Sequence, residues 1–242
     1  MTLVITGGSG TLGRAMRAIR PDALAPSRSE MDVTDRAAVR AFLSAHPPSS
    51  IIHAAALTSM SRCEAEKELA NRTNVQATEE LLRIAREVSP GCYFLFISSA
   101  GVFRGDAGGY DEDSPTSEDQ PVNHYGLTKL RAERAVLASE NTCVVRTNFV
   151  KRGAWPHERA FTDRFGTFLH ESGAAKAILE VHDARLTGIV HVVGNERLSL
   201  FELARRSSPA VLPMTASDHR GPPLTMDMTL LTKRWKSYSL DD

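Results

Sequence analysis

The stretch that decides the fold lies near the start of the chain, where residues 3–13 read LVITGGSGTLG. The branched apolar run from Leu3 to Ile5 is typical of a buried strand, and the periodicity after it predicts a helix. Glycines between them, at Gly7, Gly10 and Gly13, allow a tight turn, close approach to a pyrophosphate, and close packing of helix on strand. The stretch predicts a dinucleotide site, with contacts expected from Gly7, Ser9, Gly10, Thr11, Leu12 and Gly13.

Beyond this turn, apolar segments of strand length alternate with segments of helical periodicity. We expect strands at residues 3–5, 23–25, 51–56, 92–98, 143–146 and 188–193, and helices at 12–19, from 34 or 35 onward, and at 71–88, 123–139, 172–182 and 199–206. Such alternation is typical of parallel sheets with right-handed crossovers. The sequence therefore predicts an α/β fold, a doubly wound parallel sheet of the Rossmann type with a small C-terminal substrate-binding lobe. We expect a dinucleotide-binding domain at residues 1–147, joined by 187–193, and the lobe at 148–186 and 194–242.

Composition narrows the class of protein further. Apolar residues make up 42% of the 242 residues, which is ordinary for a globular chain. Lysine and arginine number 29, as do aspartate and glutamate, whereas a dedicated nucleic-acid binder has a large basic excess. The apolar run at 92–97 is too short to cross a bilayer, and the N-terminus does not resemble a signal peptide. We therefore expect no nucleic-acid partner and no membrane association, and a monomer or homodimer.

The cysteines bear on the compartment. Cys63, Cys92 and Cys143 are few, odd in number, and lie in or beside apolar segments. Such cysteines are typical of reduced, partly buried thiols, and we expect a cytoplasmic protein.

The segment after the second expected strand bears on the choice of cofactor. NAD sites usually place an acid there, which binds the ribose 2′-hydroxyl. Here the residues are Pro26-Ser27-Arg28-Ser29, with no acid before Glu30. A hydroxyl and a guanidinium suit a 2′-phosphate, so we expect contacts from Ser27 and Arg28 and favour NADPH, with NADH as the alternative. Arg28 is also consistent with an ordinary solvated surface residue. Asp32 and Val33 are expected near the adenine.

A tyrosine and a lysine stand four residues apart at Tyr125 and Lys129, hence on one helix face. A phenol with a pKa of ~10 is a poor acid–base group at neutral pH, and a neighbouring ammonium lowers that pKa. Lys129 is also placed to hold a nicotinamide ribose. Ser99, at the end of the fourth apolar strand, is expected to donate a hydrogen bond to a substrate carbonyl. We predict these three residues as catalytic.

Taken together, these segments resemble the extended short-chain dehydrogenase/reductase superfamily. Within it, the chain is most similar to the dTDP-4-dehydrorhamnose reductase group. The matching segments are residues 6–13, 32–35, 53–58, 74–75, 98–105, 109–113, 125–129 and 145–147. The resemblance covers about the first 150 residues with good specificity. It implies an oxidoreductase of deoxysugar biosynthesis that reduces a keto group on a nucleotide-linked deoxysugar with NADPH. It also implies cofactor contacts from Ala54, Ala55, Ala56 and Asn74.

Two departures from the family pattern concern the substrate side. Ala100-Gly101 stands where the family commonly has Asp-Tyr, and Asn148-Phe149 where it tends to have Ser-Trp. Two alternatives stay open. One is an NAD-dependent sugar-nucleotide C4 epimerase, since residues 98–103 also resemble that group. The other is a non-catalytic NADP-binding regulatory subunit, like the one that resembles this group in some methionine adenosyltransferases.

Several other residues have both a functional and a purely structural interpretation. The loop from Asp106 to Asp119 holds six acids and no base; Mg²⁺ binding is one interpretation, and a solvated loop is favoured. No histidine has metal-ligand spacing, so we predict no metal site, and His53 is interpreted as structural. Basic residues in the lobe suit a diphosphate-bearing substrate. The aromatic residues there have two interpretations: they stack on a sugar or base, or they fill the lobe core. The lobe residues concerned are Lys151, Arg152, Arg159 and Arg164, with Phe149 and Trp155; Phe149, Arg152 and Trp155, together with Ser99, are the predicted substrate contacts.

Overall fold

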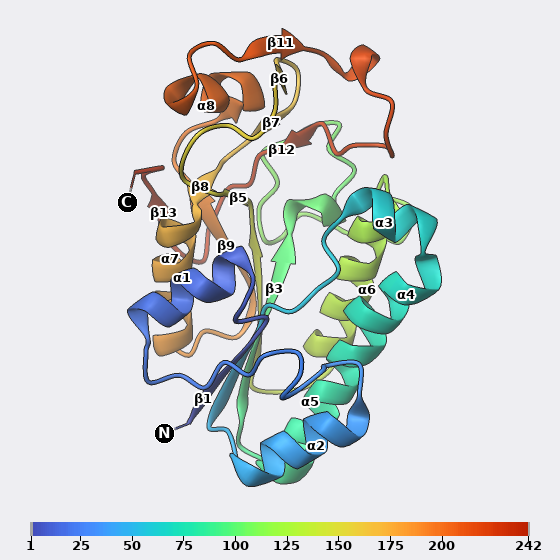
Figure 1. Ribbon diagram of the computed structural model, residues 1–242, viewed down its shortest axis with the longest axis vertical. Helices are drawn as coiled ribbons and strands as arrows, with labels where there is room; N and C mark the ends of the chain where they lie inside the picture. Colours follow the sequence, from blue (N-terminus) through green and yellow to red (C-terminus); the bar gives the residue numbers. More distant parts are fainter. Residues whose placement is uncertain (1, 242) are drawn as a thin grey trace.

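A parallel sheet lies at the centre of the computed structural model, which describes residues 2–241 (Figure 1). Within these residues six strands form the sheet in the order β1-β2-β3-β4-β9-β13, and each neighbouring pair is parallel. The strands are β1 (Leu3–Thr6), β2 (Ser50–His53), β3 (Tyr93–Ser99), β4 (Thr142–Thr147), β9 (Gly188–Gly194) and β13 (Ser237–Tyr238). The predicted α/β fold with a parallel sheet is confirmed.

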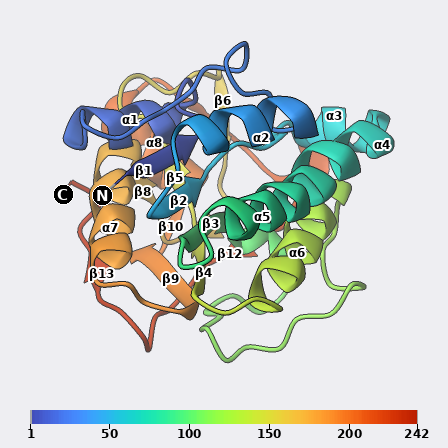
Figure 2. The same ribbon diagram turned by 90° about the horizontal axis from the view of Figure 1, so that it is seen from below.

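Helices cover both faces of this sheet, as Figure 2 shows from below. On one face α1 (Thr11–Ile19) packs against α7 (Glu171–Asp183); on the other, α5 (Ala77–Val88) packs against both α2 (Arg36–Ala45) and α6 (His124–Leu137). An apolar core lies on each face of the sheet. Strands that helices cover on both faces bury the side chains of both faces. Among residues 2–241 no helix is both long and apolar enough to span a membrane.

The second expected strand, at residues 23–25, is reduced to a single bridge. Leu24 pairs with Val4, with its amide donating to the Leu3 carbonyl at 2.9 Å and its carbonyl accepting from Ile5 at 2.8 Å. Pro26 follows at once and lacks an amide hydrogen, so the ladder cannot continue. The segment nevertheless runs beside β1, where the sequence placed it.

The helix expected at residues 71–88 is interrupted near its start. It is built from α4 (Lys67–Asn71), a π-helical turn η1 (Arg72–Gln76) and α5. Asn74 lies in this turn and is buried. Such π turns insert one extra residue and redirect the side chains they contain. Here the turn directs the Asn74 amide toward residues 57 and 128, which the site below uses.

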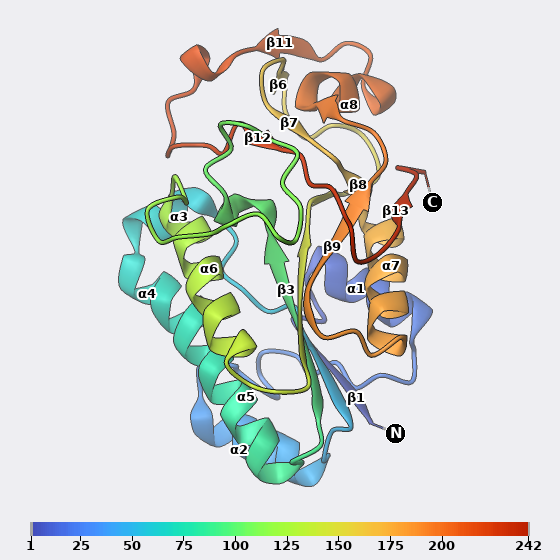
Figure 3. The same cartoon turned by 180° about the vertical axis from the view of Figure 1, so that it is seen from behind.

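The small lobe sits beyond the carboxyl ends of the strands, at the top of Figures 1 and 3. It contains α8 (Leu200–Ser207), which starts with a reciprocal capping box between Ser199 and Glu202. Three short sheets accompany it. Their strands are β5 (Phe149–Val150), β6 (Arg159–Phe161), β7 (Phe165–Gly166), β8 (Leu169–His170), β10 (Leu198–Ser199), β11 (Leu212–Met214) and β12 (Asp227–Met228).

Two segments expected in the lobe belong to the central sheet by their contacts. Helix α7, inside the expected lobe range 148–186, packs on α1 and buries Ala174, Ile178 and Val181 in the core beneath β4 and β9. Strand β13 pairs with β9 and extends the sheet. The physical reason is that α7 buries its apolar face by packing against the central sheet. We retain a division into a Rossmann domain and a lobe as a proposal, with these two segments assigned to the former.

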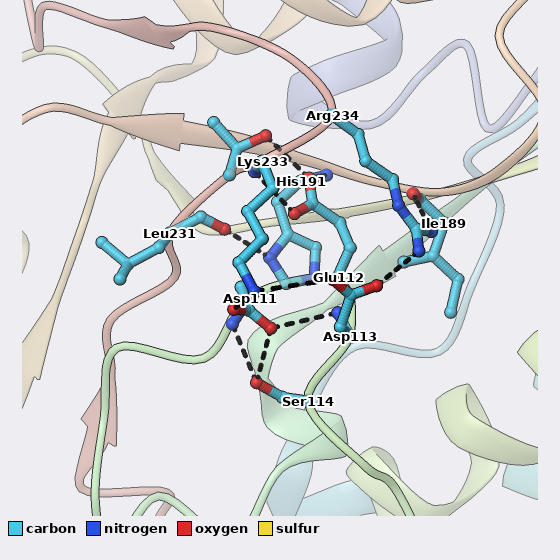
Figure 4. Close-up of polar contacts among 10 residues, drawn as sticks. Asp111, Glu112, Asp113, Ser114, Ile189, His191, Leu231, Lys233 and Arg234 are labelled. Atoms are coloured by element: carbon cyan, nitrogen blue, oxygen red, sulfur yellow. Dashed lines mark hydrogen bonds and ion pairs between the residues drawn. The ribbon is translucent and has the colours of Figure 1, made fainter.

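The acidic loop differs from the expected solvated loop (Figure 4). Glu112 is buried; its carboxylate accepts from the amides of His191 at 3.0 Å and Lys233 at 2.9 Å, and from the Thr232 hydroxyl at 2.7 Å. The Lys233 ammonium lies 2.6 Å from Asp111, and Arg234 pairs with Asp113 at the same distance. The bases that pair with Asp111 and Asp113 therefore come from about 120 residues further along the chain, so a count of charges within the loop does not reveal them.

Helix α1 approaches the turn after β1 so closely that residue 13 has no room for a side chain. A Cβ on Gly13 would lie 2.2 Å from the Gly7 carbonyl oxygen, whereas at Gly91 nothing lies within 4 Å. We expect Gly13→Ala to lower the free energy of unfolding by about 1–3 kcal/mol, as overpacked sites do. Gly91→Ala, the matched control, should stay within about 0.5 kcal/mol. Urea unfolding of the two variants checks this, and equal midpoints would contradict it.

Candidate functional site

One large cavity of about 1090 Å³ opens at the carboxyl ends of β1 to β4, between the sheet and the lobe. In doubly wound sheets ligands bind outside the carboxyl ends of the strands. Most of the predicted site residues line this cavity. From the cofactor set these are Gly7, Ser9, Gly10, Thr11, Leu12, Gly13, Arg28, Asp32, Val33, Ala54, Ala55, Ala56, Tyr125 and Lys129; Ser99, Phe149 and Trp155 join them.

The glycine turn forms one end of the cavity. Gly7 has a φ of 72°, and its carbonyl accepts from the Gly10 amide at 2.9 Å, which closes the turn. A Cβ on Gly7 would lie 2.7 Å from the Ala55 amide nitrogen. Helix α1 begins at Thr11 behind Gly10, and a glycine cap supplies no side chain for the first-turn amides. These amides and the open backbone form a cradle that fits a pyrophosphate.

Three predicted contacts do not line the cavity. Ser27 is exposed, and its hydroxyl is 2.9 Å from that of Ser29. Arg152 is exposed on the lobe, and its backbone amide donates to the Glu171 carboxylate at 2.6 Å. Asn74 lies beneath the wall. Its side chain accepts from the Leu57 amide at 2.7 Å and donates to the Leu57 carbonyl at 3.0 Å, so it holds the loop after β2 in place.

Ser99, Tyr125 and Lys129 all line the cavity. Ser99 ends β3, and Tyr125 and Lys129 lie one turn apart on α6, whose first turn is capped by the Asn123 side chain. Burial raises the pKa of Tyr125 to about 12, while a hydrogen bond with the Ser99 hydroxyl acts in the opposite direction. The net shift is upward, contrary to the expectation that the Lys129 ammonium lowers this pKa, because desolvation of the phenolate dominates.

Lys129 is itself strongly buried, with 3% of its surface exposed. Burial lowers its pKa to about 7, and the nearby Glu133 carboxylate acts against that shift. Its Nζ lies 3.9 Å from the centroid of the Phe96 ring, a distance suited to a cation–π contact.

His53 supports the floor of the site, in line with its structural interpretation. Its two ring nitrogens lie 2.6 Å from the Thr6 hydroxyl and 3.0 Å from the Thr78 hydroxyl. Burial, helped by Lys129, lowers the pKa of His53 to about 3, so the ring is neutral at neutral pH. It therefore joins β1, β2 and α5 without adding a charge.

The lobe contributes a wall that sequence reasoning largely missed. Arg159 and Arg164 were noted only as basic residues, and His157, Phe161, Phe168, Met214, His219 and Met228 were not singled out; all line the cavity. These residues come from segments that lie far apart in the sequence and that pair only through strands of two or three residues. No local sequence spacing therefore identifies them as parts of one wall.

Arg164 differs from the other arginines of this wall. Its Nε donates to the Thr225 carbonyl at 3.0 Å and its Nη2 lies 3.4 Å from the Met228 sulfur. Burial lowers its pKa to about 10. Among residues 2–241 no carboxylate pairs with it. A largely buried guanidinium without an acidic partner suits an anionic ligand.

Across residues 2–241, no three histidine, cysteine, aspartate or glutamate side chains gather as a metal site would require. Of the acids in the Asp106–Asp119 loop, Asp111 and Asp113 pair with Lys233 and Arg234, and Glu118 pairs with Arg131.

Comparison with known proteins bears on this arrangement. Methionine adenosyltransferase 2 subunit beta of Xenopus laevis is 31% identical, over 83% of this chain and 69% of that protein. The dTDP-4-dehydrorhamnose reductase of Mycolicibacterium smegmatis is 32% identical, over 86% of this chain and 69% of that enzyme. A dTDP-4-dehydrorhamnose reductase structure from Bacillus anthracis, in complex with NADP, has a TM-score of 0.85 and covers 96% of this chain and 91% of its own. At 22% identity this last likeness concerns the fold.

The family comparison agrees with these relatives. The model of the RmlD substrate binding domain matches residues 1–211, which is most of the chain. The chain belongs to the RmlD substrate binding domain family.

Proposed function

We propose that this protein reduces a keto group on a nucleotide-linked deoxysugar with NADPH. The observation that carries the proposal is a single cavity that joins the glycine turn after β1 to Ser99, Tyr125 and Lys129. A cofactor held at the turn and a carbonyl held at Ser99 would meet beside the α6 residues. The names of the reductase relatives support a dTDP-linked sugar as the substrate class.

The residues present fit a dinucleotide. The cradle at Gly7 and Gly10 leaves space where a Cβ would collide with backbone, and the α1 amides face it. The Ala54–Ala56 segment and Asp32 line the same part of the cavity. Bound NADPH supplies a hydride for the carbonyl carbon, and Lys129 is placed to hold its ribose.

The protein's own chemistry concerns the carbonyl oxygen. Because its pKa is raised to about 12, Tyr125 keeps its proton throughout the neutral range. It can therefore donate that proton to the oxygen as the alcohol forms. Ser99 donates a hydrogen bond to the same oxygen and stabilises the charge that develops there. The Lys129 ammonium adds a positive charge beside the reacting centre.

The regulatory alternative has a specific observation in its favour, the 31% identity to an adenosyltransferase subunit beta. It predicts NADPH binding without oxidation. The reductase is favoured because Ser99, Tyr125 and Lys129 converge on one cavity, which cofactor binding alone does not require. Stoichiometric NADPH oxidation with a 4-keto-deoxysugar nucleotide decides between them. A C4 epimerase would instead purify with bound NAD and show no preference for NADPH.

The compartment and assembly remain proposals. Cys63, Cys92 and Cys143 are buried free thiols, which supports a reducing, cytoplasmic setting. A monomer or homodimer is proposed, and light scattering of the purified protein tests it.

Variants of Tyr125 and Lys129 are expected to differ in their effects on turnover and on NADPH binding. Tyr125→Phe removes the proton donor, so turnover should fall by about 10²–10⁴-fold with NADPH affinity nearly unchanged, because the ring still packs. Lys129→Met should slow turnover and also weaken NADPH binding. Steady-state rates and fluorescence titration of NADPH measure both. Full turnover in Tyr125→Phe, or unchanged NADPH binding in Lys129→Met, would show that the roles are assigned wrongly.

Arg28 governs cofactor choice in this proposal. Its side chain is 81% exposed, and Nε lies 2.8 Å from Asp32 in an ion pair too solvated to be strong. A 2′-phosphate can replace Asp32 as its partner. Arg28→Ala should weaken NADPH binding by about ten- to a hundredfold, the worth of a charged hydrogen bond, and leave NADH binding unchanged. NADH titration is the internal control, and an equal loss for both cofactors contradicts the assignment.

Arg164 is proposed to bind the diphosphate of the sugar nucleotide. Arg164→Gln should weaken dTDP binding by about ten- to a hundredfold and leave thymidine binding unchanged, because only dTDP carries the anion. Calorimetry with the two ligands measures this. Arg205→Gln, an exposed arginine of α8, is the matched control. If Arg164→Gln binds dTDP as tightly as the parent protein, the diphosphate lies elsewhere.

A further inference from the structure

An ion pair is buried between α6 and β4, behind the proposed active site. Arg146 and Glu133 each expose 1% of their side chains. The Arg146 Nη2 lies 2.7 Å from the Glu133 carboxylate, and its Nε lies 3.0 and 3.2 Å from the two carboxylate oxygens. Burying two charges costs desolvation energy that their attraction often fails to recover. A contribution to folding is therefore a weak explanation for the pair.

The position of Glu133 on α6 points to a second role. Tyr125, Lys129 and Glu133 follow one another at four-residue spacing, so they share one face of the helix. Lys129 is buried with its ammonium over the Phe96 ring. Within residues 2–241 no carboxylate lies close enough to form a salt bridge with Lys129. Glu133 is the neighbouring acid whose charge acts on it.

We propose that Glu133, held in place by Arg146, is a positioning residue that favours the charged form of Lys129 near neutral pH. The proposal rests on the proposed function, in which that charge holds the cofactor ribose. It extends the site by one helical turn, to two residues that do not line the cavity.

The other groups around Lys129 cannot replace Glu133. Tyr125 on α6 and Cys63 on α3 (Met60–Ala65) have raised pKa values, about 12 and 11, and are neutral. His53 on β2 is neutral as well. Arg146 on β4 is positive and disfavours a second cation. The charged side chains of α4, η1 and α5 are exposed or partly exposed: Lys67, Glu68, Arg72, Glu79, Glu80, Arg83, Arg86 and Glu87.

The direction of the effect follows from the charges. Burial lowers the pKa of Lys129 to about 7, and Glu133 opposes this by favouring the ammonium. Removing the carboxylate lowers the pKa further, so the ammonium loses its proton at a lower pH. Arg146, left without its partner, repels the ammonium and adds to the fall. The charged fraction of Lys129 at pH 7 therefore falls.

A direct titration of Lys129 tests this without any substrate. The full chain is labelled with ¹³Cε-lysine, and the ¹³Cε shifts are followed from pH 5 to 10 by NMR. The chain has six lysines, and Lys129→Met identifies the signal. Glu133→Gln should lower the Lys129 midpoint by at least about one pH unit, a tenfold loss of proton affinity. The loss of NADPH affinity relative to the parent protein should then be greatest near pH 7 and disappear at high pH, where Lys129 is neutral in both proteins.

Two further variants keep the test decisive. Glu118→Gln removes an acid that also pairs with α6, at Arg131, but on its exposed side; it should leave the midpoint unchanged. Glu133→Gln/Arg146→Met leaves neither buried charge alone and serves if the single variant does not fold. It should lower the midpoint by less than the single variant, because the repulsion of Arg146 is gone.

The outcomes separate this inference from the proposed function. An unchanged Lys129 midpoint in both Glu133 variants overturns the inference, whatever the enzyme does. If the midpoint falls while no keto-sugar nucleotide oxidises NADPH, the electrostatic role of Glu133 stands and the reductase proposal fails. A purely structural pair would change the unfolding midpoint of the protein and leave that of Lys129 in place.

Discussion

The parallel register of β1 to β4 is the constraint on which the rest of the structure depends. Thr6, His53 and Phe96 stand side by side on three successive strands, and Ser99 pairs with Thr147 on the next. Because all carboxyl ends meet at one edge, residues from distant parts of the chain arrive at the same cavity. A slip of one residue on β3 would turn Ser99 to the opposite face.

Polar contacts as well as apolar packing fix α6 to this edge. The Asn123 side chain caps its first turn, the Asn74 amide donates to Thr128 at 3.0 Å, and Arg146 holds Glu133. Asn74 on η1 and Arg146 on β4 come from different elements, so their bonds set the rotation of α6 about its axis as well as its position. A buried polar contact left unmade is costly, which makes such bonds directional in a way that apolar packing is not. The ammonium of Lys129 is placed by this rotation.

The sequence predicted the parts of the site whose signals are local. The spacing of Gly7, Gly10 and Gly13 after a strand, and of Tyr125 and Lys129 on a helix, follows from backbone geometry alone. The contacts that were missed are made with residues far away in the sequence. The Glu112 carboxylate accepts hydrogen bonds from Thr232 and Lys233, about 120 residues further along the chain. The early end of the bridge at Leu24 has a local cause instead, since Pro26 cannot donate. The Tyr125 pKa was predicted in the wrong direction because the cost of burying a phenolate depends on the whole surrounding fold.

The positions where the sequence departs from the family pattern, residues 100–101 and 148–149, take part in contacts between segments of the fold. A Cβ on Gly126 would lie 2.1 Å from the Gly101 carbonyl, so the segment after β3 and the start of α6 are pressed together. Asn148 donates to the Met228 carbonyl at 2.6 Å, and the Met228 sulfur lies 3.4 Å from Arg164 Nη2. Residue 148 thus connects the end of β4 to β12, whose Met228 contacts Arg164. Asn148, where the family tends to have serine, therefore takes part in attaching the lobe to the sheet.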